Sequence, residues 1–457
     1  AGSGNHASLL NNNQDASSEN PAVLTVNGGN YTSNVSTILK NNEYGIVYIN
    51  GGNLTSLETY LGGYNSVINW GTMTITDGNF TSEGTVLGTG LWNEGNSSLT
   101  VTGGTFTAKE GKAALAVTKH VEEGYDDETL NVSIQNGKFD GVIGITIDST
   151  ALTGEDSFAI TGGEYTKPVS SKYVGDDFVL ASGESGSFSV YASDEVPASA
   201  KLVAGRAATP FAAESLETGY SQIFDGTEYV IVSSASASVV NAEATIGGVY
   251  YSTLAAAVAN ASESDTIVLI KDIETDTITV NKSVKIDGDG FTIKAVSGGK
   301  VTIAFSLKEG CGTLSISNVT IKASRGVDLN SEVTNVPNTV LNGVTMIVTE
   351  RGVSYGTPEA SPVTGVTGEI ISVTDSKFYA TDDVDTAIDE AFYETFTYTS
   401  TDKRGISLYN ISGDYSIKVN TSALKGFKYT VNIASNCAGM TANIIDSTVY
   451  GWAAIQT

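Results

Sequence analysis

A phrase of nine residues recurs through the first third of the chain and constrains the fold more than any other feature. The copies share one phase, at intervals of 23 to 33 residues. Self-similarity at a period of about 20 to 50 residues is typical of repeat architectures, so we expect stacked, similar units. The copies read LTVNGGNYT at 24–32, VYINGGNLT at 47–55, MTITDGNFT at 73–81, LTVTGGTFT at 99–107, VSIQNGKFD at 132–140 and FAITGGEYT at 158–166.

Each copy predicts a strand, a tight turn and a second strand. Leu99 and Val101 alternate with Thr100 and Thr102, which is the pattern of a strand with one buried face. The Gly-Gly, Asp-Gly or Asn-Gly pair supplies the positive φ of a sharp turn. One aromatic residue or Leu follows every turn, and these side chains should stack inside the protein, one per repeat. They are Tyr31, Leu54, Phe80, Phe106, Phe139 and Tyr165.

A period near 25 residues, with several short strands and no helix between them, favours an all-β parallel solenoid. Units of the βαβ type need helical crossovers, which the repeats lack. A propeller needs about 40–50 residues per blade.

The second half repeats in a different style. Its turn residue is often Asn or Asp, which also tolerate the left-handed region. An Arg-Gly pair recurs downstream, at Arg325, Arg351 and Arg404. The phrases are IDGDGFTIK (286–294), LSISNVTIK (314–322), VLNGVTMIV (340–348), ISVTDSKFY (371–379) and NIIDSTVYG (443–451).

The stretch 196–240 breaks the pattern with Pro197, Pro210 and an Ala/Ser-rich run. Beyond it, Ser252 can cap a short amphipathic helix at about 252–261, which would cover the open end of a solenoid core. We therefore predict two tandem solenoids, 1–195 and 241–457, joined by a connecting segment at 196–240.

The repeat phrases resemble the pectate-lyase-like right-handed parallel β-helix superfamily, over most of the chain. They are most similar to β-helix repeat regions of bacterial cell-surface proteins, in which A-x-I-G-G-x-Y-x-T-L-x-x-A and then D-T-I-x-L open a β-helix. The resemblance implies a right-handed, single-stranded β-helix. It does not imply one function, because this superfamily includes lyases, hydrolases, adhesins and stalks. The matching residues are Ala244, Ile246, Gly247, Gly248, Tyr250 or Tyr251, Thr253, Leu254 and Ala257, then Asp265, Thr266, Ile267 and Leu269.

The charge balance excludes one class of partner. With 24 Lys and Arg against 51 Asp and Glu, the 457 residues carry a formal charge of −27. Nucleic-acid binding needs basic patches that neutralise phosphates, so we expect none. No apolar run is long enough to span a membrane.

Three of the four arginines occupy one position of the repeat. Arg325, Arg351 and Arg404 are spaced by 26 and 53 residues, which we interpret as one coil and then about two. They should form a column on one face, about 5 Å apart per coil. The column could bind a polyanion or activate a proton for a lyase. Alternatively, the guanidinium groups pair with Glu350, Asp328 or Asp402 and support a loop.

Two further groups are candidate ligand sites. Asp382, Asp383 and Asp385 lie in an acidic insertion that could hold Ca²⁺, or that is simply solvated. Trp70 and Trp92 are 22 residues apart, close to one coil, and could form a sugar platform or pack within the coils. No other cofactor is expected.

The two cysteines, Cys311 and Cys437, are expected about four coils apart, or roughly 19 Å at 4.8 Å per coil. That separation excludes a disulfide, so we predict two free thiols.

Two functions follow. The first is a non-enzymatic module of a bacterial cell-surface or secreted protein, acting in adhesion or as a stalk and able to bind carbohydrate. The alternative is a polysaccharide lyase or glycoside hydrolase of the β-helix class acting on acidic polysaccharide. The chain lacks the Gly-His-Gly and Arg-Ile-Lys motifs of the hydrolases. Its first residue, Ala1, and its strand-like last residues suggest a fragment of a longer extracellular or wall-associated protein; the sequence does not determine the oligomeric state.

Overall fold

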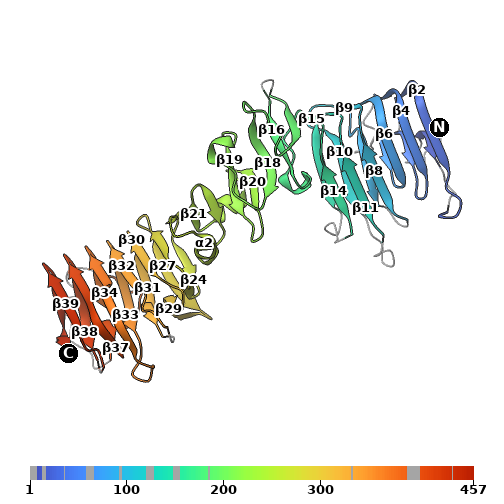
Figure 1. The fold of residues 1–457 in the computed structure, drawn as a ribbon. Coiled ribbons are helices and arrows are strands. Elements are labelled where there is room, and N and C mark those ends of the chain that lie inside the picture. The colour runs from blue at the N-terminus through green and yellow to red at the C-terminus, as the bar shows by residue number, and fades with distance from the viewer. Residues whose placement is uncertain are drawn as a thin grey trace. The chain divides into compact units, whose positions relative to one another are not determined.

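The computed structural model describes residues 8–12, 17–34, 37–57, 66–91, 95–119, 128–147, 155–183, 186–330, 333–388, 402–434 and 436–456. The chain is all-β, with long ladders of parallel strands (Figure 1). Contacts divide it into two units that are described separately. Unit 1 comprises 1–222 with 227–235, and unit 2 comprises 223–226 with 236–457. None of the described helices is long and apolar enough to cross a membrane.

Unit 1 contains two parallel ladders. We call each level of a ladder a rung; it is formed by one strand or by two short consecutive strands. Ladder A consists of β1 (Ser8–Asn12), β3 (Thr37–Asn41), β5 (Val67–Asn69), β7 (Leu87–Leu91), β10 (Ala113–Lys119) and β13 (Val142–Ile147). Ladder B consists of β2 (Val23–Ser33), β4 (Ile46–Ser56), β6 (Thr72–Ser82), β8 (Ser97–Val101) with β9 (Thr105–Ala108), β11 (Leu130–Ile134) with β12 (Lys138–Asp140), and β14 (Ser157–Ile160) with β15 (Glu164–Tyr165).

The six copies of the sequence phrase form successive rungs of ladder B, and the predicted stack is confirmed. Tyr31 lies opposite Leu54, Leu54 opposite Phe80, and the register continues to Tyr165. The ring centroids of Phe80, Phe106, Phe139 and Tyr165 follow one another at 4.7, 4.8 and 5.2 Å, with nearly parallel planes. This buried column forms the centre of the core of unit 1.

The glycine of each turn is required by both its conformation and its surroundings. Gly78 has a φ of +131°, and a Cβ there would lie 3.0 Å from the ring of Phe80. Only glycine adopts this backbone conformation without strain. The turn and the aromatic residue two positions later therefore form one structural unit.

Polar groups inside unit 1 are also arranged in columns. The side-chain amide of Asn12 donates to that of Asn41 at 3.0 Å, and Asn41 donates to Asn69 at 2.9 Å. Each amide also donates to backbone carbonyls, such as that of Gly45. A buried amide is costly unless it is hydrogen-bonded, so this column satisfies groups that the ladder encloses.

The parallel pairing of ladder B stops at β15. From there, β15 and β16 pair antiparallel with β17, and β16 and β20 pair antiparallel with β18. Three strands, at 201–207, 220–224 and 229–233, lie within the segment 196–240. Its neighbourhood contains η1 (Ser171–Tyr173), β16 (Phe178–Ser182), β17 (Phe188–Ala192), β18 (Lys201–Ala207), η2 (Ala213–Ser215), β19 (Tyr220–Phe224), β20 (Tyr229–Ser233) and α1 (Ala237–Asn241).

Unit 2 opens with the hairpin β21 (Ala244–Ile246) and β22 (Val249–Tyr251), followed by α2 (Leu254–Asn260) and β23 (Thr266–Leu269). The predicted helix is present, but Thr253 rather than Ser252 caps it, because the Thr253 hydroxyl accepts from the backbone N–H of Ala256. The helix buries Leu254, Ala257 and Val258.

Two parallel ladders follow. Ladder C consists of β23, β26 (Val284–Asp287), β30 (Thr313–Ser317), β32 (Asn338–Asn342), β34 (Val363–Thr374), β37 (Ile411–Asn420) and β39 (Met440–Ile445). Ladder D consists of β24 (Ile273–Thr275), β25 (Ile278–Val280), β27 (Thr292–Ser297), β29 (Ile303–Leu307), β31 (Thr320–Leu329), β33 (Thr345–Tyr355), β35 (Lys377–Ala380), β36 (Arg404–Leu408), β38 (Ala423–Ile433) and β40 (Thr448–Gln456), with the short antiparallel strand β28 (Lys300–Val301) beside β27.

The turns after ladder C use left-handed residues, as the Asn and Asp of the phrases predict. Asn318, Gly343, Asp375, Thr421 and Asp446 follow the strands at one register position, with φ values of 49°, 65°, 48°, 49° and 46°. One rung, β37, was not among the repeat phrases found in the sequence. Its turn residue is Thr421, at the position where the neighbouring rungs β34 and β39 have Asp375 and Asp446.

These long parallel ladders are compatible with a β-solenoid in each unit.

Candidate functional site

The three arginines form a column in the structure. Arg404 lies one rung nearer to Arg351 than the sequence spacing suggested. Arg325 lies opposite Arg351 on neighbouring strands, and Arg351 lies opposite Arg404. The 53 residues between Arg351 and Arg404 therefore span one rung step rather than two. In the sequence, residues 381–403 separate β35 from β36, and the structure describes only 381–388 and 402–403 of them.

The glycine after each arginine explains why the motif recurs. A Cβ on Gly326 would lie 2.5 Å from the sulfur of Met346, and one on Gly352 would lie 2.8 Å from the ring of Phe378. Met346 and Phe378 are fully buried core residues. The glycine makes room for a large core side chain, while the arginine before it lies on the partly exposed side of the strand.

Arg325 is held by two carboxylates. Its Nε donates to Glu350 at 2.9 Å, and its Nη1 donates to Asp328 at 3.2 Å. Burial alone would lower the pKa of Arg325, but the hydrogen bond to Glu350 and the charges of Asp328 and Glu350 raise it overall. This guanidinium is thus already neutralised.

Arg351 occupies the middle of the column and has a different environment. Its Nη1 donates to the Ser354 hydroxyl at 3.1 Å, and among the described residues it has no ion pair. Burial lowers the pKa of Arg351, and the charges of Arg325 and Arg404 lower it further. Arg351 is therefore the arginine whose charge the protein compensates least.

Asp328 is almost completely buried beneath the column. Burial raises the pKa of this carboxyl, although Arg325 and Arg351 act in the opposite direction. Its Oδ2 has no hydrogen-bond partner among the described residues.

Arg404 belongs to an aromatic cluster that sequence reasoning missed. Its guanidinium lies 5.3 Å from the ring centroid of Tyr409 and 5.7 Å from that of Tyr429, and it donates to Asp402 at 2.7 Å. Trp452 meets Tyr429 edge-on at 5.9 Å. The Trp452 side chain is 64% exposed, so the outer face of β36, β38 and β40 presents rings beside a cation. We call Arg404, Tyr429 and Trp452 the aromatic face.

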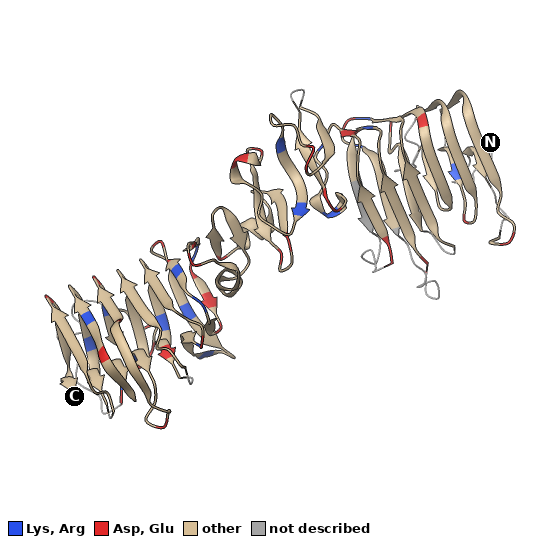
Figure 2. Ribbon diagram, viewed as in Figure 1, with Lys and Arg blue, Asp and Glu red and all other residues tan. Residues whose placement is uncertain are grey.

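The column as a whole carries little net charge. Arg325 and Arg404 are each paired with carboxylates, and basic residues are sparse over both units (Figure 2). The pairing with Glu350, Asp328 and Asp402 is the supporting arrangement that the sequence left open as an alternative. Arg351 alone offers a guanidinium for an added anion.

Two of the three aspartates proposed for Ca²⁺ pair with lysines. Asp385 accepts from Lys294 at 2.7 Å and from Lys322 at 3.2 Å, and Asp382 pairs with Lys403 at 2.5 Å. An Asp383 oxygen accepts from the backbone N–H of Asp385. Within the described ranges, no three His, Cys, Asp or Glu side chains gather as a metal site would require.

The tryptophan pair is only partly described. Trp70 is half-buried, and the Lys40 ammonium lies 4.2 Å from its ring centroid. Trp92 lies outside the described residues, so the proposed platform of two rings stays a prediction.

Two other features bear on chemistry. Cys311 is buried and Cys437 is half-buried, and both are free thiols, as predicted. A cavity of about 380 Å³ beside Tyr409 has mainly apolar walls. Glu309, the carboxylate among its described lining residues, accepts from the backbone N–H and hydroxyl of Thr334.

The alignment of the two lysines with each other, though not their contact with Asp385, could have been found from the sequence. Lys294 and Lys322 end two consecutive copies of the phrase, and the structure places them opposite each other.

Comparison with known proteins does not indicate a function for this site, since no family model, curated protein or solved structure matches the chain.

Proposed function

We propose that this chain is a non-enzymatic module of a bacterial cell-surface or secreted protein, in which two right-handed parallel β-helices act as a stalk or an adhesive segment. The observation that carries the proposal is the pairing of the arginine column. Arg325 and Arg404 form salt bridges with carboxylates of the protein itself, so we infer that they stabilise the ladder rather than bind a substrate. The stacked cores of both units fit a load-bearing or display role, and the acidity fits a soluble, exported surface.

The adhesive part of the proposal rests on the aromatic face. Exposed rings contact the apolar faces of sugar rings, and Arg404, which is paired with Asp402, lies against the Tyr429 ring of the same face. Trp452 supplies the exposed ring, and Tyr429 supports it from the preceding rung. The proposed ligand class is therefore carbohydrate.

A glycan array in the presence of Ca²⁺ tests this function. We expect the chain to bind a subset of glycans, and Trp452→Ala to weaken binding by about tenfold, which is equivalent to about 1.4 kcal/mol. Tyr48→Ala is the matched control, because Tyr48 is an exposed aromatic residue of unit 1, away from this face. Binding that survives Trp452→Ala would remove the aromatic face from the proposal. Absence of all glycan binding would leave only the stalk.

A polysaccharide lyase is the second candidate, and one observation favours it. Burial and two neighbouring cations lower the pKa of Arg351, which is the direction that a basic arginine needs. A lyase would release unsaturated, ultraviolet-absorbing products from polyuronates, and Arg351→Ala would abolish them. We expect no such products. Their appearance, with loss in Arg351→Ala, would replace the stalk with an enzyme.

A further inference from the structure

One outward face of ladder B in unit 1 carries no charged side chain. Along its strands, buried inward residues such as Ile75 and Val101 alternate with outward residues that are exposed or half-exposed. The outward residues form three columns of six across β2, β4, β6, β8, β11 and β14. We call these eighteen side chains the neutral face. They are Val23, Ile46, Thr72, Ser98, Asn131 and Ser157, then Thr25, Tyr48, Thr74, Thr100, Ser133 and Ala159, and then Asn27, Asn50, Thr76, Thr102, Gln135 and Thr161.

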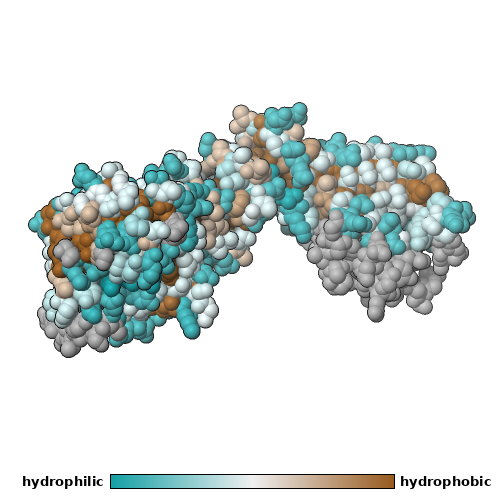
Figure 3. Space-filling view, turned by 60° about the horizontal axis from the view of Figure 1, so that its bottom comes forward, coloured by the Kyte–Doolittle hydropathy of each residue, from teal (hydrophilic) through white to brown (hydrophobic). Residues whose placement is uncertain are grey.

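The absence of charge distinguishes this face from the rest of the chain, in which 16% of the residues are charged. An outward column of ladder C in unit 2 does carry charge, because Lys285 and Lys418 lie in register with Ser315 and Ser372. In Figure 2, β8, β11 and β14 are tan throughout, and Figure 3 shows pale and brown surface across the described part of unit 1. The neutral face therefore offers an approaching surface no group for a salt bridge.

The side chains of the neutral face are held on a regular lattice. Neighbouring rungs are about 4.8 Å apart, and successive outward residues of one strand are about 6.6 Å apart. Threonine is the commonest residue of the face, and its branched Cβ restricts its χ1 angle. In the third column, Asn50 donates to Asn27 at 2.8 Å, and Thr76 donates to Asn50 at 3.1 Å. Hydroxyl, amide and methyl groups are thus presented in fixed positions that repeat at every rung.

Size and charge restrict what can lie against this face. Five rung steps and four residues along a strand amount to about 24 Å by about 13 Å. That area is well below the ~800 Å² that each partner of a stable protein complex buries. A chain with a net charge of −27 also repels anionic surfaces. The occupant that fits is neutral, forms hydrogen bonds and repeats in step with the rungs.

Ice and crystalline neutral polysaccharide both meet this description, and the side chains favour ice. Sugars are bound mainly against aromatic rings, and Tyr48 is the one aromatic residue among the eighteen. Threonine presents a hydroxyl and a methyl group together, so it can hold ordered water without the strongly oriented hydration shell of a charged group. The rung spacing is close to the repeat of water molecules along one axis of an ice crystal.

We propose that the neutral face binds ice, through water molecules that its hydroxyl and amide groups hold in the positions of the crystal lattice. Because the lattice of side chains exists before binding, little conformational entropy is lost when the face meets the crystal. Bridging waters can then contribute nearly as much as direct hydrogen bonds. The proposal is independent of glycan binding and of the arginine column.

The test places charge at the centre of the neutral face. Thr74 and Thr100 lie opposite each other on β6 and β8, so the test variant carries Thr74→Lys and Thr100→Lys. The matched control carries Ser315→Lys and Ser372→Lys, which changes half-exposed hydroxyl residues in the ladder C column that already contains lysines. Should the double test variant lose its β-sheet circular dichroism, its two substitutions are used singly.

Uptake into ice and thermal hysteresis are the two measurements. We expect the wild-type chain and the control to enter a slowly growing ice crystal and to lower its freezing point below its melting point. The test variant should lose most of both activities, because two ammonium groups interrupt the lattice. Exclusion of the wild type from ice, or equal uptake of the test variant, would overturn the proposal. So would wild-type binding to crystalline cellulose or chitin that the two lysines abolish while ice uptake is absent, because the occupant would then be a polysaccharide.

Discussion

Ladder B of unit 1 and ladder C of unit 2 make similar turns with different residues. In ladder B the turn glycines have φ values between 100° and 131°, a region closed to residues with a side chain. In ladder C the turn residues have φ values between 46° and 65°, where Asn, Asp and even Thr421 are found. Similar turns are therefore made with two backbone conformations. One requires glycine, and the other also accepts Asn, Asp and Thr.

The difference extends to the core beside the turn. In ladder B five of the six turn glycines lie against the aromatic ring two residues later, Gly52 being followed by Leu54 instead, and the rings stack from Phe80 to Tyr165. In ladder D the large core residue Phe378 is accommodated by the glycine of an Arg-Gly pair, Gly352. Unit 1 thus joins turn and core in one phrase, while unit 2 separates them. Four sets of substitutions test how the two units differ, from the largest expected effect to the smallest.

Removal of a ring from the middle of the stack should have the largest effect. Phe106→Ala should destabilise unit 1 by about 3–5 kcal/mol, because it leaves a cavity between two stacked rings. Phe378→Ala is the counterpart in unit 2, fully buried but without a stacked partner among the described residues. It should cost about 0.5–1.5 kcal/mol less, which is the usual contribution of aromatic pairing. Urea denaturation measures both, and equal losses would argue against a contribution from the stack.

A side chain at the glycine-specific turn should have the next largest effect. Gly78→Ala should destabilise the protein by about 1–3 kcal/mol, the usual cost of a residue forced into such a backbone region. The close approach of the new Cβ to Phe80 adds to this cost. Hydrogen exchange should show the loss of protection concentrated in β6 and its neighbours. Unchanged protection there would mean that the turn relaxes without cost.

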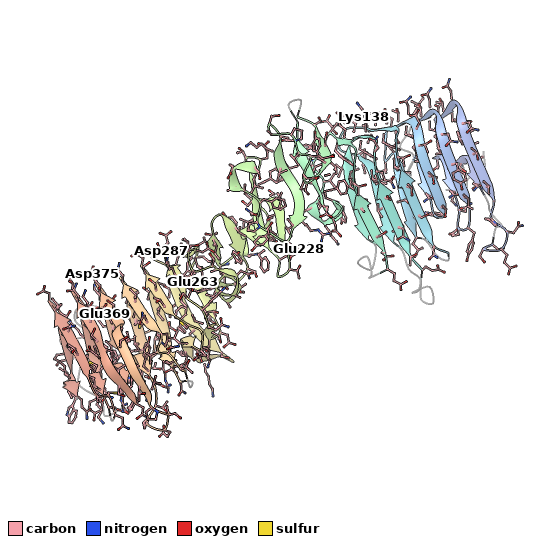
Figure 4. All side chains as sticks on the ribbon, in the orientation of Figure 1. Lys138, Glu228, Glu263, Asp287, Glu369 and Asp375 are labelled. Carbon is pink, nitrogen blue, oxygen red and sulfur yellow. The ribbon has the colours of Figure 1, made fainter. Side chains whose placement is uncertain are left out.

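Substitutions in a turn of ladder C should change the free energy of unfolding less. Asp375, which Figure 4 shows where the strands of ladder C end, has a φ of 48°. Asp375→Ala should cost about 1 kcal/mol, since alanine tolerates the left-handed region less well than Asp. Asp375→Gly should be nearly neutral. A thermal melt that ranks glycine below alanine at this site would contradict the contrast between the two turns.

The smallest effect concerns the acidic insertion of unit 2. Hydrogen bonds from Lys294 and Lys322 hold the pKa of Asp385 below its ordinary value of 3.8. Because the folded pKa is depressed, Asp385 stabilises the fold above pH 3.8, and this contribution disappears as the pH falls through the folded pKa. Asp385→Asn should therefore have a lower urea midpoint than the wild type at neutral pH and an equal one in strong acid. If the difference in urea midpoint between Asp385→Asn and the wild type does not change with pH, the lysine contacts of the Asp385 carboxylate do not stabilise the fold.

The sequence predicted those parts of the fold that repeat. Self-similarity alone placed Tyr31 to Tyr165 in one column and Arg325 to Arg404 in another. The antiparallel strands β16 to β20 were missed because they occur once, so no second copy revealed their register. The rung β37 was missed because Thr421 replaces the Asn or Asp that marks its neighbours.

The candidate site was predictable where its partners lie within one rung of each other. Glu350, Asp328 and Asp402 were recognised as partners because they are close to the arginines in the chain or the register. Asp385 contacts Lys294 and Lys322 across 91 and 63 residues, a distance that no local pattern encodes. Trp452 was missed because a single aromatic residue in a strand usually indicates core.

The most direct test of the parallel ladders is a distance between two remote residues. Lys285 and Lys418 are 133 residues apart by their numbers, yet ladder C places them four rung steps apart on one face. Spin labels at these positions, with Cys311 and Cys437 replaced by Ala, should give a narrow distance distribution in double electron–electron resonance. It should centre near 19 Å, at about 4.8 Å per rung. A broad distribution, or one centred a full rung step or more away, would contradict the register on which the ladders rest.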